Sequence, residues 1–384
     1  MKKLLIVLLG LTIAAASMAQ QSNATTTKPF QVSFLPGFGT AGINSKDLDC
    51  NFSFNIIGGN IHGLNGFEIG GVFNIEHGYM KGSQISGVSN LIGGNIDGIQ
   101  IAGVHNTGLG TLKGAQLAGV SNIIKGTAQG GQISGVFNAA KSIAGVQLTG
   151  VANFTLDSAG TQIAGVTNFS KVSKGLQLSG VVNVATERME GAQISGVINV
   201  SKNVKGLQLG VINIADSVDG VTIGLFNFIR SGVHSVELSH EDIMDYNFTY
   251  RGGTDRLYSL VSFGIKSQQF WSSGAGLGTS FNTPVPNLLA SIEASTHMIQ
   301  LTQRPQLRGE YSLNKVQLTA GYRLNKYISV YGGPSLNIFL AELDDDPTDN
   351  PIANLGPDGF NHRTYNNGNE LKMWIGYKVG LRFF

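Results

Sequence analysis

The sequence contains a single cysteine and few charged residues. Of its 384 residues only 13% are Asp, Glu, Lys or Arg, and 26 basic residues stand against 24 acidic ones. A chain with this balance has no basic surface that would attract nucleic acid. Cys50 cannot form an internal disulfide, so we expect an inert thiol, with an intermolecular disulfide as the alternative. The stability of the fold must therefore come from another source.

Long apolar runs are absent after the first residues of the chain. The opening segment MKKLLIVLLGLTIAAASMA combines two lysines, an apolar stretch from Leu4 to Ala16 and a small-residue cleavage motif that ends at Ala19. An apolar stretch of about 13 residues is too short to span a bilayer and is typical of a secretory signal peptide. Cleavage would remove two lysines and leave 24 basic and 24 acidic residues. Because no later run approaches 20 apolar residues, membrane insertion would require a β-barrel.

Glycine, by contrast, is abundant, and 24 of the 53 glycines belong to one repeated motif. The motif reads GSQISGVSN at Gly82–Asn90 and returns as GIQIAGVHN and GAQLAGVSN. Each copy closes on an asparagine, and these asparagines follow one another at intervals of 14 to 16 residues: Asn74, Asn90, Asn106, Asn122, Asn138, Asn153, Asn168, Asn183, Asn199, Asn213 and Asn227. A fixed period over eleven copies is typical of a repeat array or solenoid.

The residue types within one copy predict two short strands and a corner. Glycines and β-branched residues disfavour a helix. The apolar residues Ile85, Val88 and Leu91 are three apart, which does not fit one flat strand with alternating faces. We therefore expect a bend at Gly87 that turns all three toward a common core, followed by a variable polar turn. The variable residue before each closing asparagine, such as His105, is expected to point away from that core.

Stacked coils would place the closing asparagines above one another at about 4.8 Å. At that spacing each side-chain amide would bond to its neighbours and stabilise the turns, so we predict a structural asparagine ladder rather than a ligand site. The glutamines of the motif are predicted to form a second, exposed row: Gln84, Gln100, Gln116 and Gln132.

A rival interpretation makes each copy one strand of a single large antiparallel membrane barrel. A segment such as GLQLSGVVNV has the 9 to 11 residues that a membrane strand needs. Its Gly, Gln, Ser and Asn face would suit a wet lumen, but the opposite face would be a weak lipid surface. The repeat also lacks aromatic girdles and alternating short and long turns. These observations favour the solenoid.

From about Ser235 the repeats stop and regular alternation begins. In the final segment LKMWIGYKVGLRFF, apolar residues from Leu371 to Phe383 alternate with Lys372, Lys378 and Arg382. This pattern resembles the last strand of outer-membrane β-barrels, although it runs in register with Phe383 rather than with the terminal Phe384. Further strands are predicted near residues 246–252, 257–266, 271–281, 288–301, 307–324 and 327–340. Six aromatic residues are candidates for interfacial belts: Tyr311, Tyr322, Tyr327, Tyr331, Trp374 and Tyr377.

Short links alternate with a long polar loop, residues 344–370, which fits a small antiparallel barrel of about eight strands. A soluble β-sandwich packed on the solenoid is the alternative. The sequence thus predicts an all-β chain with a signal peptide (1–19), N-terminal cap strands (20–60), a glycine-rich repeat region (61–230) and a barrel-like C-terminal domain (231–384).

Candidate chemistry is sparse. The segment GAGLGT at residues 274–279 has the glycines of a phosphate-binding loop but lies within an alternating strand pattern. The segment SHEDIMD, Ser239–Asp245, contains four titratable residues and is predicted to be a solvated junction loop. An acidic run lacks the spacing of a calcium loop: Asp344, Asp345, Asp346 and Asp349. We therefore predict no catalytic, cofactor-binding or metal-binding residues and no cofactor.

The repeat GxQ[IL][SA]GVxN, set between a signal peptide and a β-rich end, resembles the surface-repeat proteins of bacterial envelopes known from spirochaetes and Bacteroidetes. The segments GFEIGGVFNI, GPSLNIFLAEL and GGTDRLYSL are similar to that family as well. The resemblance covers most of the mature chain and implies exposure at the cell envelope. It supplies no active site, because the family is functionally uncharacterised.

These observations favour a non-enzymatic surface protein anchored in the outer membrane, with a structural or adhesive role and an extracellular protein or glycan as a possible ligand. A pore formed by one large barrel is the alternative. A polysaccharide-processing enzyme would need clustered carboxylates on one face, whereas the acids of the repeats, such as Glu68, Asp97 and Asp157, are expected in turns of different coils.

Overall fold

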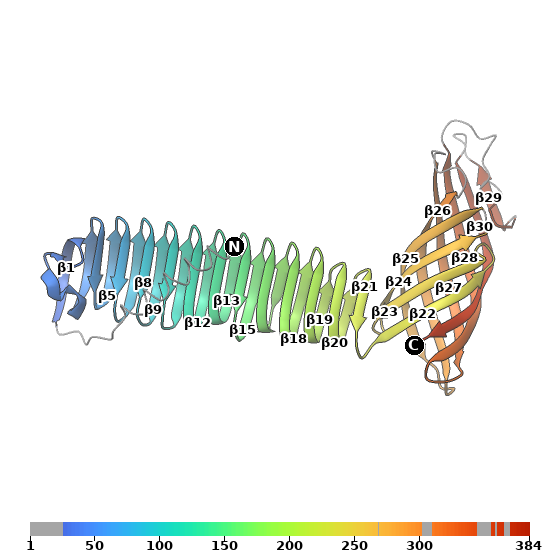
Figure 1. The fold of residues 1–384 in the computed structure, drawn as a ribbon, viewed down its shortest axis with the longest axis horizontal. Coiled ribbons are helices and arrows are strands. Elements are labelled where there is room, and N and C mark those ends of the chain that lie inside the picture. Colours follow the sequence, from blue (N-terminus) through green and yellow to red (C-terminus); the bar gives the residue numbers. More distant parts are fainter. Residues whose placement is uncertain (1–25, 268, 302–308, 344–354, 358, 365–368) are drawn as a thin grey trace. The chain divides into compact units, whose positions relative to one another are not determined.

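The structure is a computed structural model that describes residues 26–267, 269–301, 309–343, 355–357, 359–364 and 369–384. In this part of the chain most residues lie in β-strands, and one short 3-10 helix is present (Figure 1). No helix in the described ranges is long and apolar enough to cross a membrane. The predicted signal peptide, residues 1–19, lies outside the described residues. The chain divides into two compact units between Ser201 and Lys202.

The first part of the chain is a β-solenoid, as the repeat predicted. It begins with β1 (Thr26–Leu35), β2 (Phe38–Gly39), the 3-10 helix η1 (Gly42–Asp47), β3 (Leu48–Asn55) and β4 (Gly58–Ile61). The repeat copies form β5 (Gly63–Gly70), β6 (Phe73–Glu76), β7 (Met80–Ser86), β8 (Ser89–Ile92), β9 (Ile96–Ala102), β10 (His105–Gly108), β11 (Leu112–Ala118), β12 (Ser121–Ser134), β13 (Phe137–Thr149), β14 (Ala152–Thr155), β15 (Ser158–Ala164), β16 (Thr167–Ser173), β17 (Leu176–Ser179), β18 (Val182–Ser195), β19 (Ile198–Leu209), β20 (Ile212–Ile223) and β21 (Phe226–Ile229).

Each coil contributes one segment to each of two parallel sheets. The segment before the corner pairs with its equivalent, as β7 does with β5 and β9, and the segment after the corner does the same, as β8 does with β6 and β10. Asn90 is in register with Asn74 on one side and with Asn106 on the other. Successive copies are therefore parallel, so the interpretation as one large antiparallel barrel is wrong. The N-terminal strands β1 and β3 pair in parallel and continue this arrangement at the N-terminal end of the solenoid.

The closing asparagines are fully or almost fully buried and form the predicted ladder. The Nδ2 of Asn90 donates to Oδ1 of Asn106 at 2.9 Å and also to the carbonyl oxygen of Ile101 at 2.9 Å. Seven further asparagine pairs from Asn74 to Asn199, and the pair Asn213–Asn227, repeat the amide-to-amide bond at 2.7 to 3.1 Å. In each of these nine pairs the donor asparagine thus links its own coil to the next one at two points.

The prediction of which other residues of the motif are buried and which are exposed was wrong. The glutamines were expected to be exposed, but Gln84, Gln100, Gln116 and Gln132 are completely buried. They form a second ladder in which Gln116 Nε2 donates to Gln100 Oε1 at 2.7 Å. Conversely Val88 is 42% exposed, and Ile85 and Leu91 are half-buried on the outer surface. The bend at Gly87 does turn these three residues to one side, but that side is the outside of the coil.

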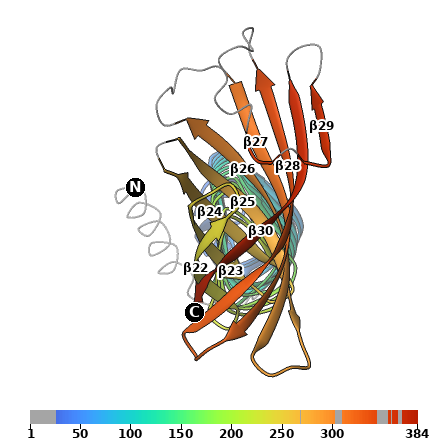
Figure 2. The same ribbon diagram turned by 90° about the vertical axis from the view of Figure 1, so that its right-hand side faces the viewer.

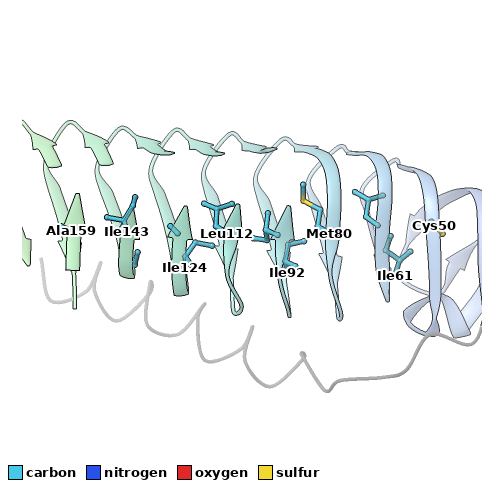
Figure 3. Packing of buried hydrophobic residues seen from close by; sticks show 12 residues of the cluster. Cys50, Ile61, Met80, Ile92, Leu112, Ile124, Ile143 and Ala159 are labelled. Carbon is cyan, nitrogen blue, oxygen red and sulfur yellow. The ribbon is translucent and has the colours of Figure 1, made fainter. Parts of the chain in front are cut away.

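The interior also contains an apolar column, at the other end of each coil. It is formed by the residue two places before the leading glycine and by the residue two places after the asparagine (Figure 3). In Figure 3, Met80, Ile92, Leu112 and Ile124 lie between the two strands of their coils. The coil interior is therefore divided between amide ladders near the glycine corner and aliphatic side chains near the variable turn.

The corner glycines are required by the close approach of neighbouring coils. A Cβ atom on Gly135 would lie 2.3 Å from the carbonyl oxygen of Gly119 in the preceding coil. At the leading position Gly82 has a φ of +119°, and a Cβ atom there would lie 1.9 Å from the carbonyl oxygen of Gly66. No L-residue with a side chain fits either place without moving the backbone.

The last part of the chain is a closed antiparallel barrel. Its strands are β22 (Val233–Glu241), β23 (Tyr246–Gly253), β24 (Tyr258–Lys266), β25 (Phe270–Asn282), β26 (Leu288–Leu301), β27 (Gly309–Arg323), β28 (Ile328–Leu343) and β30 (Glu370–Phe383), with the short β29 (Asn361–Thr364) beside β30. Each strand pairs with the next, and β22 pairs with β30, so the eight strands close on themselves (Figure 2). The predicted barrel is confirmed, and the alternative of a β-sandwich is wrong.

The side chains of the barrel alternate between a polar interior and an apolar outer wall. In β30, Lys372, Lys378 and Arg382 are buried, whereas Ile375 and Val379 are exposed. Three of the aromatic residues predicted for interfacial belts are instead buried in the interior: Tyr311, Tyr331 and Trp374. The other three are exposed: Tyr322, Tyr327 and Tyr377. The belt prediction is therefore wrong for half of its members, because alternation carries those rings to the inner face.

The arrangement of the ladder yields a mutational test. Replacing Asn138 with Ala removes the acceptor for Asn122 and the donor to Asn153 and to the carbonyl oxygen of Leu148. We expect a loss of about 1–3 kcal/mol in the free energy of unfolding, because buried polar groups lose their partners. Val136→Ala, at the exposed corner of the same coil, should change it by no more than about 0.5 kcal/mol. Denaturant unfolding measures both variants, and a larger loss for Val136→Ala would contradict the inverted arrangement.

Candidate functional site

The barrel interior contains the densest group of titratable side chains in the described residues. Glu237, on β22, is completely buried and faces three cations. Its carboxylate accepts from Arg382 Nε at 2.6 Å and lies 3.3 Å from Arg251 Nη1 and 3.3 Å from Lys378 Nζ. The hydroxyl of Tyr331 donates to the same carboxylate at 2.8 Å. These partners come from β23, β28 and β30, so Glu237 links β22 to its neighbours β23 and β30 and to β28, which lies next to β30.

Two further carboxylates extend this network. Glu293, on β26, accepts from Arg251 Nη2 at 2.6 Å and from the hydroxyl of Tyr258 at 3.0 Å. Glu241, at the end of β22, forms an ion pair with Lys315 of β27 and accepts from Asn247 Nδ2 at 2.8 Å. The network therefore spans the barrel from one wall to the other.

Charges in this interior are largely compensated. Three carboxylates, of Glu237, Glu241 and Glu293, face four cations, of Arg251, Lys315, Lys378 and Arg382. An unpaired ion in such a setting would be strongly disfavoured, whereas ions that share partners are tolerated. We call this group of seven residues the lumen network.

The lumen network leaves little free space. A cavity of about 10 Å³ lies between Glu241, Glu293, His297 and Lys378, which is room for about one water molecule. A barrel of about eight strands is just wide enough for side chains to fill it. This cavity is therefore too small for an organic ligand.

The outer wall has the opposite character. Exposed apolar side chains occur on every strand of the barrel: Leu238, Phe248, Phe263, Ile265, Leu277, Ile292, Val316, Leu318, Val330, Leu340, Ile375, Val379 and Leu381. A soluble domain does not usually expose an apolar surface that continues around a whole barrel. A charged interior inside an apolar wall is the arrangement of transmembrane β-barrels.

The segment Ser239–Asp245 differs from its prediction as a solvated loop. Ser239 to Glu241 belong to β22, and Glu241 is buried in the lumen network. Asp242 accepts from the indole nitrogen of Trp374 at 2.5 Å, while Asp245 lies 3.1 Å from Lys266 Nζ in a part-buried ion pair. The sequence signal that was missed is the alternation of Glu237, Ser239 and Glu241, which marks the inner face of a strand.

The remaining candidates from the sequence form no site within the part of the chain that the structure describes. Residues 274–279 lie within β25, as expected from their alternating pattern. Among the described residues, no group of three or more His, Cys, Asp and Glu side chains is placed to hold a metal ion. The acidic run Asp344, Asp345, Asp346 and Asp349 lies outside those residues. Cys50 is completely buried, and burial raises the pKa of its thiol to about 11, which keeps it protonated and unreactive.

The solenoid contains one pair of buried carboxyl groups that the sequence analysis did not find. Glu68 was expected in a turn, but it occupies the glutamine position of its coil and is completely buried. It accepts from Asn55 Nδ2 at 2.7 Å and from Gln84 Nε2 at 2.9 Å. Glu76 lies beside it, also completely buried, and accepts from the same Gln84 amide. With no exposed surface, this pair cannot reach a substrate.

Glu76 is held largely in its protonated form. Its pKa lies well above the ordinary value because burial disfavours the carboxylate and because the charge of Glu68 is close. Both carboxyl groups stand at the N-terminal end of the glutamine ladder, whose amides all donate toward that end. The two carboxyl groups therefore accept the hydrogen bonds that Gln84, at this end of the ladder, donates.

Comparison with protein-family models, with curated proteins and with solved structures finds no match to this chain. The interpretation of its function therefore depends on the described geometry.

The lumen network predicts a large effect at Glu237. Replacing it with Gln retains its size but leaves Arg251, Lys378 and Arg382 without a carboxylate at the centre of the network. We expect the barrel to lose about 3–5 kcal/mol of stability, as for other broken buried ion pairs. The midpoint of unfolding in detergent, followed by the gel mobility of the folded barrel, measures this loss. Asp255→Asn, at an exposed turn of the same barrel, is the control and should unfold like the parent.

The carboxyl pair predicts that stability depends on pH. Because the folded state holds the proton of Glu76 above the pH at which the unfolded chain releases it, the contribution of this group to stability is largest in acid. It then falls as the pH rises from about 4.5 toward the raised pKa. Glu76→Gln should abolish this decline and unfold at higher denaturant concentration than the parent at neutral pH. Glu187→Gln, at an exposed site, should keep the decline. An unchanged profile in Glu76→Gln would exclude the pair as its cause.

Proposed function

We propose that this chain is an outer-membrane protein in which a sealed eight-strand barrel anchors a β-solenoid, and that the solenoid is a non-enzymatic scaffold or binding surface of the cell envelope. The observation that carries the proposal is the inversion of polarity in the barrel. Exposed residues such as Phe263, Ile292 and Ile375 form the wall, while the lumen network fills the inside. A bilayer around the wall gives this inversion its physical reason.

Export is the second part of the proposal. The opening segment has the basic, apolar and small-residue regions of a secretory signal. The terminal strand β30 carries the alternating pattern that resembles the last strand of outer-membrane barrels. Both features favour a chain that crosses the inner membrane and inserts in the outer one.

The filled interior favours an anchor over a pore. The lumen network closes the barrel with ion pairs at 2.6 to 3.3 Å, and the cavity beside it is about 10 Å³. A conducting channel needs a continuous wet path, which larger barrels have. We therefore expect no steady conductance from this barrel.

The connections of the barrel favour one orientation. At the end where β22 begins and β30 ends, the strands are joined through residues 254–257, 283–287 and 324–327. At the opposite end residues 242–245 and 267–269 form two short connections, and residues 302–308 and 344–369 form two longer ones. Outer-membrane barrels have short turns on the periplasmic side and longer loops outside the cell. The orientation we propose therefore has the beginning of β22 on the periplasmic side.

This orientation also assigns a side to the repeats. The described solenoid then lies on the side where β22 begins, because it joins the barrel through the start of that strand. The repeats were expected outside the cell, whereas the loop lengths favour the periplasm. The ligand we propose for the repeats is accordingly a protein or glycan of the envelope.

The orientation predicts the reactivity of two engineered cysteines in a Cys50→Ser background. Phe360→Cys lies in the connection between β28 and β30, and Lys141→Cys lies on the outer surface of the solenoid. In intact cells we expect Phe360→Cys to react with a membrane-impermeant maleimide and Lys141→Cys to stay unlabelled. After permeabilisation of the outer membrane both should react.

Each of the following outcomes would contradict one part of the proposed function. Labelling at position 141 in intact cells would return the repeats to the cell surface. Recovery of the protein in the soluble fraction would contradict the membrane anchor. Steady channel conductance of the purified protein in planar bilayers would contradict the sealed lumen.

A further inference from the structure

The last coil of the solenoid packs against the outer wall of the barrel, within the second compact unit. Nδ2 of Asn227, the last amide of the ladder, donates to Oγ of Ser259 at 3.0 Å. The Ser259 hydroxyl in turn donates to the carbonyl oxygen of Leu225 at 3.0 Å. Ser259 alternates with the inward Tyr258 and Leu260, so it belongs to the outer face of β24, yet it is only 2% exposed. The coil therefore covers a patch of the wall where the barrel strands meet the short turns.

The coil presents different sides toward the two ends of the barrel. On β21, Phe226 and Phe228 lie 6.2 Å and 6.0 Å from Tyr250, measured between ring centroids. Tyr250 is on the outer face of β23, farther from the short turn 254–257 than Gly252. The next outward residues along β23 in that direction are the exposed Phe248 and Tyr246. The outer face of β21 is thus continuous with the apolar wall.

The opposite side of the same coil lies by the short turn. Asp219 and Gly220 line an open pocket of about 240 Å³ together with Thr254, Asp255 and Arg256 of that turn. The guanidinium of Arg256 lies 3.9 Å from the carboxylate of Asp219, and both side chains are largely exposed. The polar side of the coil therefore points toward water at the end of the barrel.

We infer that the outer face of the last two coils rests on the bilayer leaflet that surrounds the barrel at its short-turn end. We call this surface the lipid face, and its members are Ile212, Ile214, Phe226 and Phe228, with Lys202 and Arg230 at its borders. The inference rests on the proposed membrane insertion of the barrel.

Lipid is the occupant that fits the lipid face for two reasons. The face continues the apolar wall through the contact of Phe226 and Phe228 with Tyr250, so a bilayer that reaches Phe248 also comes close to β21. Lys202 and Arg230 are exposed on the same outward side, where long cationic side chains reach phosphate headgroups while their stems stay in apolar surroundings. Asp216, at the equivalent position of the coil between them, is half-buried.

Two isoleucines of equal size and similar exposure allow a matched test. Ile214, on the lipid face, is 39% exposed, and Ile223, in the opposite sheet, is 36% exposed. Each is replaced by Cys in a Cys50→Ser background of the full chain and carries an environment-sensitive fluorophore. A third variant, Ile292→Cys, places the same fluorophore on the barrel wall. The proteins are reconstituted in vesicles of phosphatidylcholine and phosphatidylglycerol with or without brominated acyl chains.

We expect brominated lipid to quench the fluorophore at positions 214 and 292 and to leave position 223 unchanged. Quenching at 292 without quenching at 214 overturns the lipid face while the membrane anchor stands. No quenching at 292 overturns the anchor itself. Self-quenching at 214 that persists in detergent, with no effect of brominated lipid, assigns this face to a second copy of the chain and overturns the inference.

Discussion

The hydrogen bond between side-chain amides of successive coils is the interaction on which the solenoid depends. An amide group both donates and accepts, so a column of identical residues at the spacing of parallel strands satisfies itself without any other partner. Asn138 shows the full set of bonds, to Asn122, to Asn153 and to the carbonyl oxygen of Leu148. This requirement explains why the asparagine recurs in every copy: a residue of another type would leave both neighbours with buried, unpaired groups.

The two ladders run in opposite directions, and this sets what their ends need. Asparagine amides donate toward the C-terminal coils, so their last donor, Asn227, needs an acceptor, which the hydroxyl of Ser259 supplies. Glutamine amides donate toward the N-terminus, and there Glu68 accepts from Gln84. This arrangement places two buried carboxyl groups next to each other. Glu76 lies beside Glu68, and its pKa is raised by burial and by the charge of Glu68. The acid at the start of the repeats thus follows from the polarity of the ladder.

The period, the coil and the asparagine ladder follow from the sequence, because repeated identity at a fixed spacing records contacts between equivalent residues. Which face of the coil is buried does not follow from the sequence. The motif has an apolar side with Ile85 and Val88 and an uncharged polar side with Gln84, and burial of the apolar side is the usual outcome. In this coil the polar side is buried instead, because the bend at the glycine corner turns it inward, where the side-chain amides bond to one another. In the barrel, alternation predicts most strands. It does not reveal partners such as Glu237 and Lys378, which are 141 residues apart in the chain.

The solenoid and the barrel share the same arrangement of polar and apolar side chains. Both bury polar groups and expose apolar ones, and both tolerate this because the buried groups have partners fixed by strand register. The outward Ile and Val rows of the coils are costly in water, as is the apolar wall of the barrel, and a bilayer removes that cost for the wall. The contact of Phe226 and Phe228 with Tyr250 makes the two surfaces continuous at the last coil. A coil that ends its ladder on the barrel wall needs no separate cap, so we expect the final repeats to be ordered by the same membrane insertion that orders the anchor.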